Sequence, residues 1–285
     1  MGTFFHRHRG VTPYLLLAPG IVWLAIFFLI PLAFLGYESL QSGLFPNFEF
    51  TWQFSNFSDG IRDYHTQLLR SFVYAGIATL ACLVLAYPLV YWIAFRAGAW
   101  RNLFLLFIVA PFFVTYLVRT LAWLNILADE GPVVGILRDL HILGPDGRLL
   151  ATTFAVVSGI TYNFFPFMAL PIYVSLEQMD ARLLEAAKDL YASPIQAFIR
   201  VTLPLSAPGI VAGTLLTFIP AAGDFINAAL LGTPNQAMIG NVIQSKFLES
   251  LDYPSAAALS FILMGLILVA LLVYARIVGS ERLTG

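Results

Sequence analysis

Apolar residues gather in long runs that short polar segments separate, and this spacing predicts membrane-spanning helices. A helix needs about 20 consecutive, mostly apolar residues to cross a bilayer core. The runs show no period-2 alternation, which argues against the strands of a barrel. Six runs are long enough, and they lie roughly at Thr12–Gly36, Ser71–Phe95, Asn102–Leu127, Leu149–Val174, Leu205–Leu231 and Ser255–Val278.

The composition agrees with this interpretation. Hydrophobic residues make up 59% of the 285 residues and charged residues 11%, whereas soluble chains carry about 25% charged residues. The formal net charge of −1 gives no basic excess for nucleic acid. The single cysteine, Cys82, lies inside an apolar run, so neither a disulfide framework nor a cysteine metal site is expected. The sequence indicates an integral, all-helical membrane protein.

Charge placement predicts the orientation. The basic start His6-Arg7-His8-Arg9 precedes an apolar run that is too long for a signal-peptide core, so we expect a retained first span. With that start in the cytoplasm, most Lys and Arg residues fall inside: Arg7, Arg9, Arg96, Arg101, Arg182, Lys188, Arg200, Arg276 and Arg282. Fewer fall outside: Arg62, Arg70, Arg138, Arg148 and Lys246. The positive-inside rule therefore favours cytoplasmic positions for both termini.

Acidic residues favour the outer loops instead, where they would attract cations or simply be solvated. Several expected spans contain proline, among them Pro88, Pro111, Pro166, Pro171 and Pro220. Each proline removes one helical hydrogen bond and favours a kink. Such breaks are tolerated in membranes where neighbouring helices or a wet cavity satisfy the backbone. The pattern is typical of a bundle that lines a pathway.

The loop between the fourth and fifth spans, Leu176–Pro208, is too polar to cross the membrane. Apolar residues recur in it at helical spacing, which predicts an amphipathic helix for which Asp180 is a candidate N-cap. A turn is expected at Tyr191-Ala192. Ser193-Pro194-Ile195-Gln196 then has the pattern of a capping box with proline at the first helical position. The second helix is expected to end near Thr202, because Pro204 restricts the residue before it.

Two short helices joined at a corner can dock as a unit into a groove on another protein. The alternative is an amphipathic hairpin that lies on the membrane surface. That alternative requires more positive charge than Arg182, Lys188 and Arg200 provide against four acidic residues of the same segment. Docking to a cytoplasmic partner is therefore the favoured interpretation.

The motif of this loop resembles the EAA loop of ABC-importer permeases. The matching segments are Glu185-Ala186-Ala187, Asp189-Leu190-Tyr191-Ala192-Ser193-Pro194 and Val201-Thr202-Leu203-Pro204-Leu205. The resemblance implies a type I ABC-importer permease fold with six transmembrane helices in the inner membrane of a prokaryote. It also implies that the loop couples the permease to an ATPase through Asp180, Leu183, Glu185, Ala186, Ala187, Asp189, Tyr191, Ser193 and Pro194.

The resemblance suggests three parts of the chain. Residues 1–69 hold the cytoplasmic tail, the first span and an outer loop; residues 70–277 hold a five-helix core with the coupling loop at 176–204; residues 278–285 form a cytoplasmic tail. One position departs from the family, which usually has glycine where this chain has Tyr191. A left-handed backbone there costs a residue with a side chain roughly 1–2 kcal/mol.

Several segments are similar to permeases of spermidine/putrescine importers. They are Leu117-Val118-Arg119-Thr120-Leu121-Ala122-Trp123, Phe165-Pro166-Phe167-Met168-Ala169-Leu170-Pro171, Gly223-Asp224-Phe225, Gly232-Thr233-Pro234 and Met238-Ile239-Gly240-Asn241. The resemblance implies a second permease, two ATPase subunits that bind ATP and Mg, an extracytoplasmic binding protein and alternating access. Permeases for other small solutes share many of these segments, so another substrate is the alternative.

The chain has no sign of an enzyme of its own. Neither lysine lies in a Gly-Lys-Ser/Thr phosphate loop, and protease motifs such as His-Glu-x-x-His are missing from the sequence. No cofactor or metal is therefore expected in this chain, and His6 and His8 are more often solvated than ligating. A secondary transporter or channel is the alternative from another class, but it predicts inverted repeats and a midplane ionisable relay.

Two charges fall clearly inside the spans, Arg119 and Asp224, and such charges are functional candidates. Arg119 would repel a cationic solute, so we expect a structural role at helix ends or against the second permease. Asp224 suits either a cationic solute or a structural pair, for which Arg119 is a possible partner, and Asn227 follows it on the same helix face. Aromatic rings can hold an amine or simply pack, and the candidates are Tyr162 and Phe164 beside Asn163.

Overall fold

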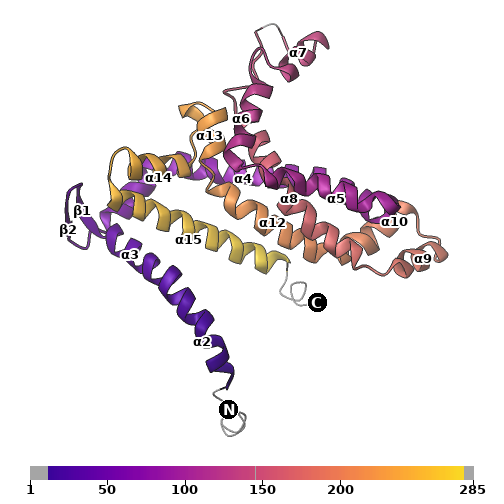
Figure 1. The fold of residues 1–285 in the computed structure, drawn as a ribbon, viewed down its shortest axis with the longest axis horizontal. Helices are drawn as coiled ribbons and strands as arrows, with labels where there is room; N and C mark the ends of the chain where they lie inside the picture. Colours follow the sequence, from indigo (N-terminus) through magenta and orange to yellow (C-terminus); the bar gives the residue numbers. More distant parts are fainter. Residues whose placement is uncertain (1–11, 145, 279–285) are drawn as a thin grey trace. The chain divides into compact units, whose positions relative to one another are not determined.

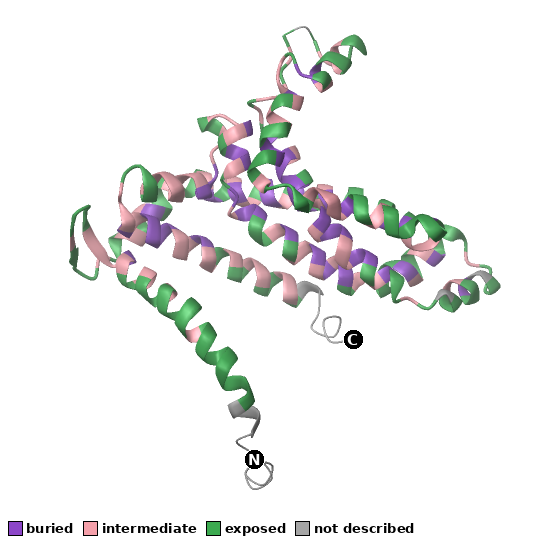
Figure 2. Cartoon of the chain, viewed as in Figure 1, coloured by how far each residue is buried: buried purple, intermediate pink, exposed green. Residues whose placement is uncertain are grey.

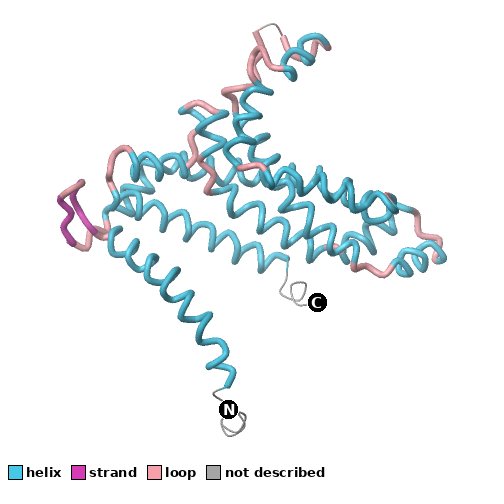
Figure 3. Tube along the Cα trace, viewed as in Figure 1, coloured by secondary structure: helices cyan, strands magenta, loops and turns pink. Residues whose placement is uncertain are grey.

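The structure is a computed structural model that describes residues 12–144 and 146–278. The basic start of the chain, including His6 and His8, lies outside the described residues, as does nearly all of the expected tail at 278–285. The described chain is mostly helical, with one two-stranded hairpin (Figure 1, Figure 3). It forms two compact units, which are described separately below.

The first unit contains the N-terminal helices, the hairpin, the start of α4 and Ser245–Ile262. Its elements begin with α2 (Thr12–Leu24), a π-helical stretch (Ala25–Leu29), α3 (Ile30–Ser39), β1 (Gln41–Leu44) and β2 (Asn47–Phe50). The strands are antiparallel, and Gln41 pairs with Phe50 and Leu44 with Asn47. Helices α2 and α3 are exposed along most of their length (Figure 2), as expected for a span whose apolar side chains face lipid.

The second unit holds Asp63–Gln244 and the part of α15 (Tyr253–Val278) that follows Ile262. Helix α4 (Ser55–Arg96) continues into this unit after a non-helical residue at Tyr64. The remaining elements are α5 (Arg101–Val109), α6 (Tyr116–Leu127), α7 (Pro132–Asp139), α8 (Thr153–Glu177), α9 (Ala181–Asp189), α10 (Pro194–Ala197), α11 (Leu203–Leu205), α12 (Ala207–Ala222), α13 (Ile226–Leu231) and α14 (Ile239–Leu248). Short 3-10 or π segments lie at Gly98–Trp100, Ala110–Phe113, Phe198–Thr202 and Pro234–Gln236.

Helices α8 and α12 lie side by side at the centre of the second unit (Figure 1). Glycines permit this close approach, because a Cβ on Gly209 would lie 2.5 Å from the carbonyl oxygen of Pro171. A Cβ on Gly213 would likewise lie 2.9 Å from the sulfur of Met168. Small residues at such contacts are typical of helix packing in membranes, where lipid tails give no hydrophobic drive for association.

Helix α4 packs against α8 through an apolar cluster. Cys82, Val90 and Ile93 of α4 are fully buried together with Met168 and Ile172 of α8. A few polar bonds join the same helices; the Cys82 thiol donates to the Thr161 carbonyl at 3.3 Å, for example. Helix α8 is thus covered on two sides, which explains why its buried residues run along its whole length (Figure 2).

Within residues 12–144 and 146–278, five helices are long and apolar enough to cross a membrane, and the number rises to six if one bent pair is counted as a span. The bent pair joins Pro194–Leu205 to Ala207–Ala222 at an angle of 62°. The other five candidates are Leu16–Ser39, Ser55–Arg96, Tyr116–Asp139, Thr153–Glu177 and Tyr253–Arg276. The predicted all-helical, six-span architecture is confirmed at this level.

Three local predictions are wrong. The expected span Asn102–Leu127 is broken, because Val114 and Thr115 are extended between the Ala110–Phe113 turn and α6. The expected span Leu205–Leu231 is interrupted at 223–225, between α12 and α13. The third error concerns Pro204, which does not end the second loop helix: Leu203 keeps helical angles and the backbone bends at Ser206 instead. Pro204 follows the π-helical stretch Phe198–Thr202 directly, and the backbone stays helical on both sides of it.

Candidate functional site

The cytoplasmic loop forms two short helices with a sharp corner, as the sequence predicts. Helix α9 begins after Asp180, whose carboxylate accepts a hydrogen bond from the Arg182 amide at 2.9 Å. At α10 the Ser193 hydroxyl accepts from the Gln196 amide, while the Gln196 side chain accepts from the Ser193 amide. The predicted N-cap and capping box are both confirmed. Such a cap contributes about 1 kcal/mol and fixes where the helix starts.

Tyr191 forms the corner of this loop. Its φ of +58° lies in the left-handed region, and its side chain is 97% exposed. The Ala192 amide donates to the Ala187 carbonyl at 3.0 Å and closes the turn that ends α9. The tyrosine therefore adopts the conformation for which glycine is favoured, without any packing contact that offsets the strain.

The other predicted coupling residues of α9 differ in exposure. Ala187 is buried, whereas Leu183, Glu185, Ala186 and Asp189 are exposed. Their exposure leaves a surface for a partner.

The segment after the corner is tied to the helical bundle. The Phe198 ring packs against Tyr87 and Tyr91 of α4, with centroids 5.5 and 5.9 Å apart. The Tyr87 and Ser206 hydroxyls share a buried hydrogen bond of 2.7 Å at the bend before α12. These contacts join the segment after the corner to α4 and to the bend before α12.

A buried polar cluster connects α6, α8 and α13. Asp224, 6% exposed, accepts hydrogen bonds from the Asn227 amide at 2.9 Å and the Asn227 side chain at 3.0 Å. The Tyr116 hydroxyl also donates to this carboxylate. The same hydroxyl accepts a hydrogen bond from the Asn227 side-chain nitrogen at 2.5 Å. These donors compensate for removing the carboxylate from water. Asp224 and Asn227 thus lie together, but not on one helix face as the sequence suggested, because Asp224 lies in the loop before α13.

Asn163 extends the cluster into the middle of α8. Its amide nitrogen donates to Thr120 at 3.2 Å and to the Asn227 side-chain oxygen at 3.3 Å. The Asn163 side-chain oxygen is buried and accepts no hydrogen bond. Gly159, one turn earlier, leaves the room for Asn227, because a Cβ there would lie 2.5 Å from its oxygen. The cluster therefore contains an acceptor that lacks a donor.

Arg119 lies beside the cluster without joining it. Its guanidinium carbon is 5.7 Å from the ring centroids of Phe112 and Tyr116, which is cation–π distance. The side chain is 7% exposed, and its Nε and Nη1 atoms have no hydrogen-bond partner. Among the ion pairs between described residues, none joins Arg119 to Asp224, so the pairing considered from the sequence is absent in this conformation.

The predicted aromatic residues occupy different places. Phe164 is buried, with its ring 5.9 Å from that of Tyr116, so it packs beside the cluster. Tyr162 is 36% exposed and packs on Trp123 instead. The sequence interpretation missed Tyr116 and Thr120. Both flank Arg119 on α6, and Tyr116 lies one helical turn before Thr120, so the embedded charge was the signal that could have identified them.

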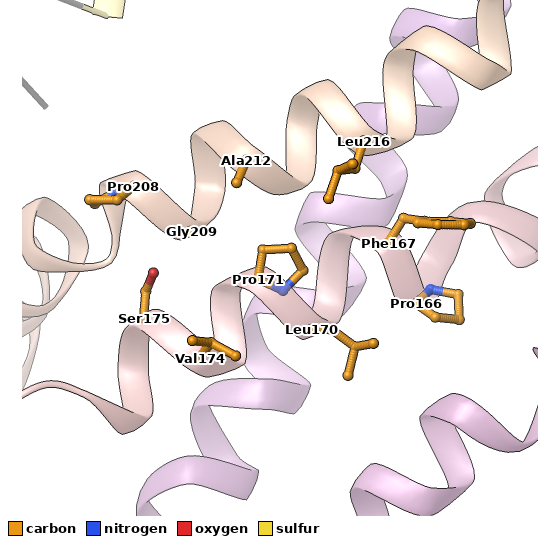
Figure 4. Close-up of a pocket in the computed structure, with 10 residues that line it drawn as sticks. All are labelled: Pro166, Phe167, Leu170, Pro171, Val174, Ser175, Pro208, Gly209, Ala212 and Leu216. Carbon is orange, nitrogen blue, oxygen red and sulfur yellow. The ribbon is translucent and has the colours of Figure 1, made fainter. Parts of the chain in front are cut away.

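An open apolar groove of about 440 Å³ runs between α8 and α12 (Figure 4). Pro166, Phe167 and Pro171 contribute one wall, and Gly209 and Leu216 contribute the other. Its lining is almost free of polar side chains, and Ser175 is the exception among the residues drawn. The groove itself offers no partner for a charged solute.

Comparison with known proteins identifies the family. The sequence model described as "Binding-protein-dependent transport system inner membrane component" matches residues 66–280. The chain belongs to this family. It is therefore the permease component of an ABC importer, located in the inner membrane and distinct from the subunit that hydrolyses ATP. This result excludes the secondary transporter or channel that the sequence left as an alternative.

Curated relatives of this permease include two spermidine/putrescine transport system permease proteins PotB. The chain is 38% identical to the protein of Haemophilus influenzae over 256 residues, which is 89% of this chain and 90% of the relative. It is 41% identical to that of Escherichia coli over 213 residues, which is 75% and 78%. A bacterial ABC transporter that imports the acidic polysaccharide alginate has a chain with the same fold, with a TM-score of 0.75 and 18% identity over 99% of both chains.

Proposed function

We propose that this permease imports a polyamine such as spermidine or putrescine, by alternating access and together with a second permease. The observation that carries the proposal is the identity of about 40% to the two PotB proteins over most of the chain. The sequence segments that suggested polyamine permeases include Asp224 of the buried cluster, Arg119 beside the cluster, and Gly232-Thr233-Pro234. The remaining alternative is a permease for another small solute.

In this proposal the polar cluster recognises an ammonium group as it passes. An ammonium is a compact donor of three hydrogen bonds with a positive charge. Asp224 offers the negative charge, the Asn163 oxygen is an acceptor without a donor, and Tyr116 offers a hydroxyl and a ring face. In this conformation Asn227 and Tyr116 already donate hydrogen bonds to the Asp224 carboxylate. Helices α6 and α13 would therefore have to separate before the carboxylate could bind an ammonium group. Closure of the cluster then corresponds to a state without solute.

The proposed energy source is a pair of ATPase subunits, which bind ATP and Mg and receive the corner around Tyr191. The exposed residues Leu183, Glu185 and Asp189 would contact the ATPase, while Phe198 and Ser206 link the corner to the bundle. A periplasmic binding protein delivers solute to such transporters, and the family description names this dependence. ATP binding would thus bias one two-state bundle from the cytoplasmic side, and the loaded binding protein would bias it from the other.

The test is uptake of labelled spermidine by vesicles that hold the complete transporter and its binding protein. We expect Asp224→Asn to reduce uptake roughly 10- to 100-fold, as for losing a hydrogen bond to a charged group. The matched control is Asp59→Asn, because Asp59 forms an exposed ion pair with Arg62 at 3.1 Å and such pairs contribute little.

Assembly is measured separately by copurification of the ATPase. Reduced uptake by Asp224→Asn with normal assembly supports the pathway assignment. Normal uptake by this variant would remove Asp224 from the pathway, and a transporter that moves another solute but no polyamine would overturn the substrate assignment.

A further inference from the structure

The hairpin after the first span is held firmly to the helices on either side of it. The Asn56 side chain donates to the carbonyls of Ser39 and Gln41, both at 2.9 Å, and the Gln53 amide donates to the Leu40 carbonyl at 2.9 Å. These bonds fix both ends of the hairpin. An isolated two-stranded hairpin is marginally stable in water, so this one depends on such contacts and on a surface that covers it.

One row of aromatic rings runs from the end of α3 across this hairpin. The rings of Tyr37 and Phe50 stack with centroids 4.8 Å apart, Phe50 meets Trp52 at 4.9 Å, and Trp52 stacks on Phe54 at 6.2 Å. The side chains are 47%, 38%, 63% and 63% exposed in that order. We name these four residues the aromatic ladder. It is an ordered apolar surface that the described chain leaves largely uncovered.

The one charged side chain of the hairpin lies on the face opposite to the ladder. Phe48 and Phe50 share one face of β2, because side chains alternate along a strand, and Glu49 with its cross-strand partner Ser42 lies opposite. Glu49 is the only charged residue in the stretch 41–54, and Gln41 is the polar partner of Phe50 on the ladder side. The ladder therefore belongs to the uncharged face of the hairpin.

The position of the ladder along the chain places it at the membrane boundary. The candidate span Leu16–Ser39 ends two residues after Tyr37, and its exposed side chains are apolar throughout. A helix of that length extends about 36 Å, compared with about 30 Å for the hydrocarbon core and 40–45 Å for the whole bilayer. The end of α3 therefore lies at headgroup depth, and the ladder continues the lipid-facing surface directly.

We propose that the aromatic ladder is an interfacial anchor whose partner is the glycerol and headgroup layer of the phospholipid. Tyr and Trp suit this layer because their rings are apolar while the Tyr37 hydroxyl and the Trp52 indole N–H can bond to ester or phosphate oxygens. The anchor fixes the depth of the first span at the membrane surface opposite the N-terminus. The inference does not depend on the transported solute or on the ATPase contact.

The test uses Trp52 as its own probe. The full chain carries five tryptophans, and Trp23→Phe, Trp92→Phe, Trp100→Phe and Trp123→Phe together leave Trp52 as the only tryptophan of this chain. The variant is assembled with its partner subunits and reconstituted into phosphatidylcholine vesicles that contain lipid brominated either near the headgroup or near the chain terminus. The emission of the same complex with Trp52→Phe is subtracted, so that the emission of the partner subunits does not enter the result. We expect the shallow label to quench emission by roughly half and the deep label clearly less, as for an interfacial indole.

A matched control places the probe on the opposite face of β2. In the same background, Trp52→Phe with Glu49→Trp should give emission that aqueous acrylamide quenches and neither brominated lipid does. Should the multiple replacement fail to fold, the wild-type chain and Trp52→Phe are compared directly, and the emission that the single change removes should be the part quenched by the shallow label. Trp52 emission that neither lipid reduces overturns the proposal, whether water or another protein subunit then surrounds the ring.

Discussion

Replacing Tyr191 with glycine should stabilise the corner of the cytoplasmic loop. The tyrosine has a φ of +58° and a side chain that is 97% exposed, so the substitution removes strain without removing an internal contact. The left-handed conformation costs a residue with a side chain about 1–2 kcal/mol, and glycine avoids this strain. Glycine also has more conformational freedom in the unfolded chain, which reduces the stabilisation by about 0.5–1 kcal/mol. The net gain in the free energy of local opening is about 0.5–1 kcal/mol.

Hydrogen exchange measures this gain at the corner. The Leu190 and Ala192 amides donate to the carbonyls of Ala186 and Ala187 at 3.1 and 3.0 Å, so both are protected only while the corner is closed. A gain of about 0.5–1 kcal/mol should slow their exchange roughly 2- to 5-fold, since a factor of ten corresponds to about 1.4 kcal/mol. The control is Tyr191→Ala, which removes the ring but keeps the strained conformation, and whose exchange should match the wild type.

Equal slowing in the alanine and glycine variants would refute the strain argument, because the ring rather than the backbone would then be responsible. Unchanged or faster exchange in the glycine variant would refute it as well. Measured on the assembled transporter, the same two variants also report on the proposed ATPase contact. If the Tyr191 ring contacts the ATPase, the glycine and alanine variants should reduce copurification of the ATPase equally, because both variants lack the ring.

Two further substitutions test the packing and the cap. Gly209→Ala should lower the unfolding temperature of the purified permease, at a cost of about 1–3 kcal/mol, because its Cβ would lie 2.5 Å from the Pro171 carbonyl oxygen. The control is Gly76→Ala, whose Cβ would meet no atom of a neighbouring segment within 4 Å and should not lower the unfolding temperature. Ser193→Ala should speed exchange of the Gln196 amide roughly 5-fold, since losing an N-cap costs about 1 kcal/mol. An unchanged Gln196 amide would show that the cap does not hold α10.

The architecture could be predicted from the sequence because span length and hydropathy depend on composition within short windows. The two helix starts at Asp180 and Ser193 could also be predicted. Each is fixed by one side chain that accepts a hydrogen bond from an amide two or three residues later in the chain. The breaks at 114–115 and 223–225 were missed because each lies inside a long apolar run, although Pro111 and Gly223-Asp224 were local signals of an interruption. The error at Pro204 has a different origin: a restriction on the preceding residue was treated as a helix end, and the neighbouring turns kept Leu203 helical.

The candidate pathway residues were only partly predictable. Asp224 and Asn227 are near in sequence, so their proximity could be predicted, although Asp224 lies in the loop before α13 and not on a helix face. The approach of Tyr116 and Asn163 depends on how α6 and α8 pack. Arg119 stood out because charge is rare in a span, but the sequence could not show that aromatic rings rather than Asp224 would be its neighbours. Domain limits and the roles of the coupling and pathway residues stay predictions.

The bend at Ser206 gives the segment before it the geometry of a rigid arm that could tilt about one point. The arm Pro194–Leu205 meets α12 at 62°, and the hydroxyl bond between Tyr87 and Ser206 marks the pivot. At 1.5 Å per residue the arm is about 18 Å long, so a tilt of about 10° would swing its far end through about 3 Å. A small rotation of the arm thus displaces its far end by about the length of a hydrogen bond. In the proposed transporter, this displacement is enough to form or break side-chain contacts with a neighbouring subunit.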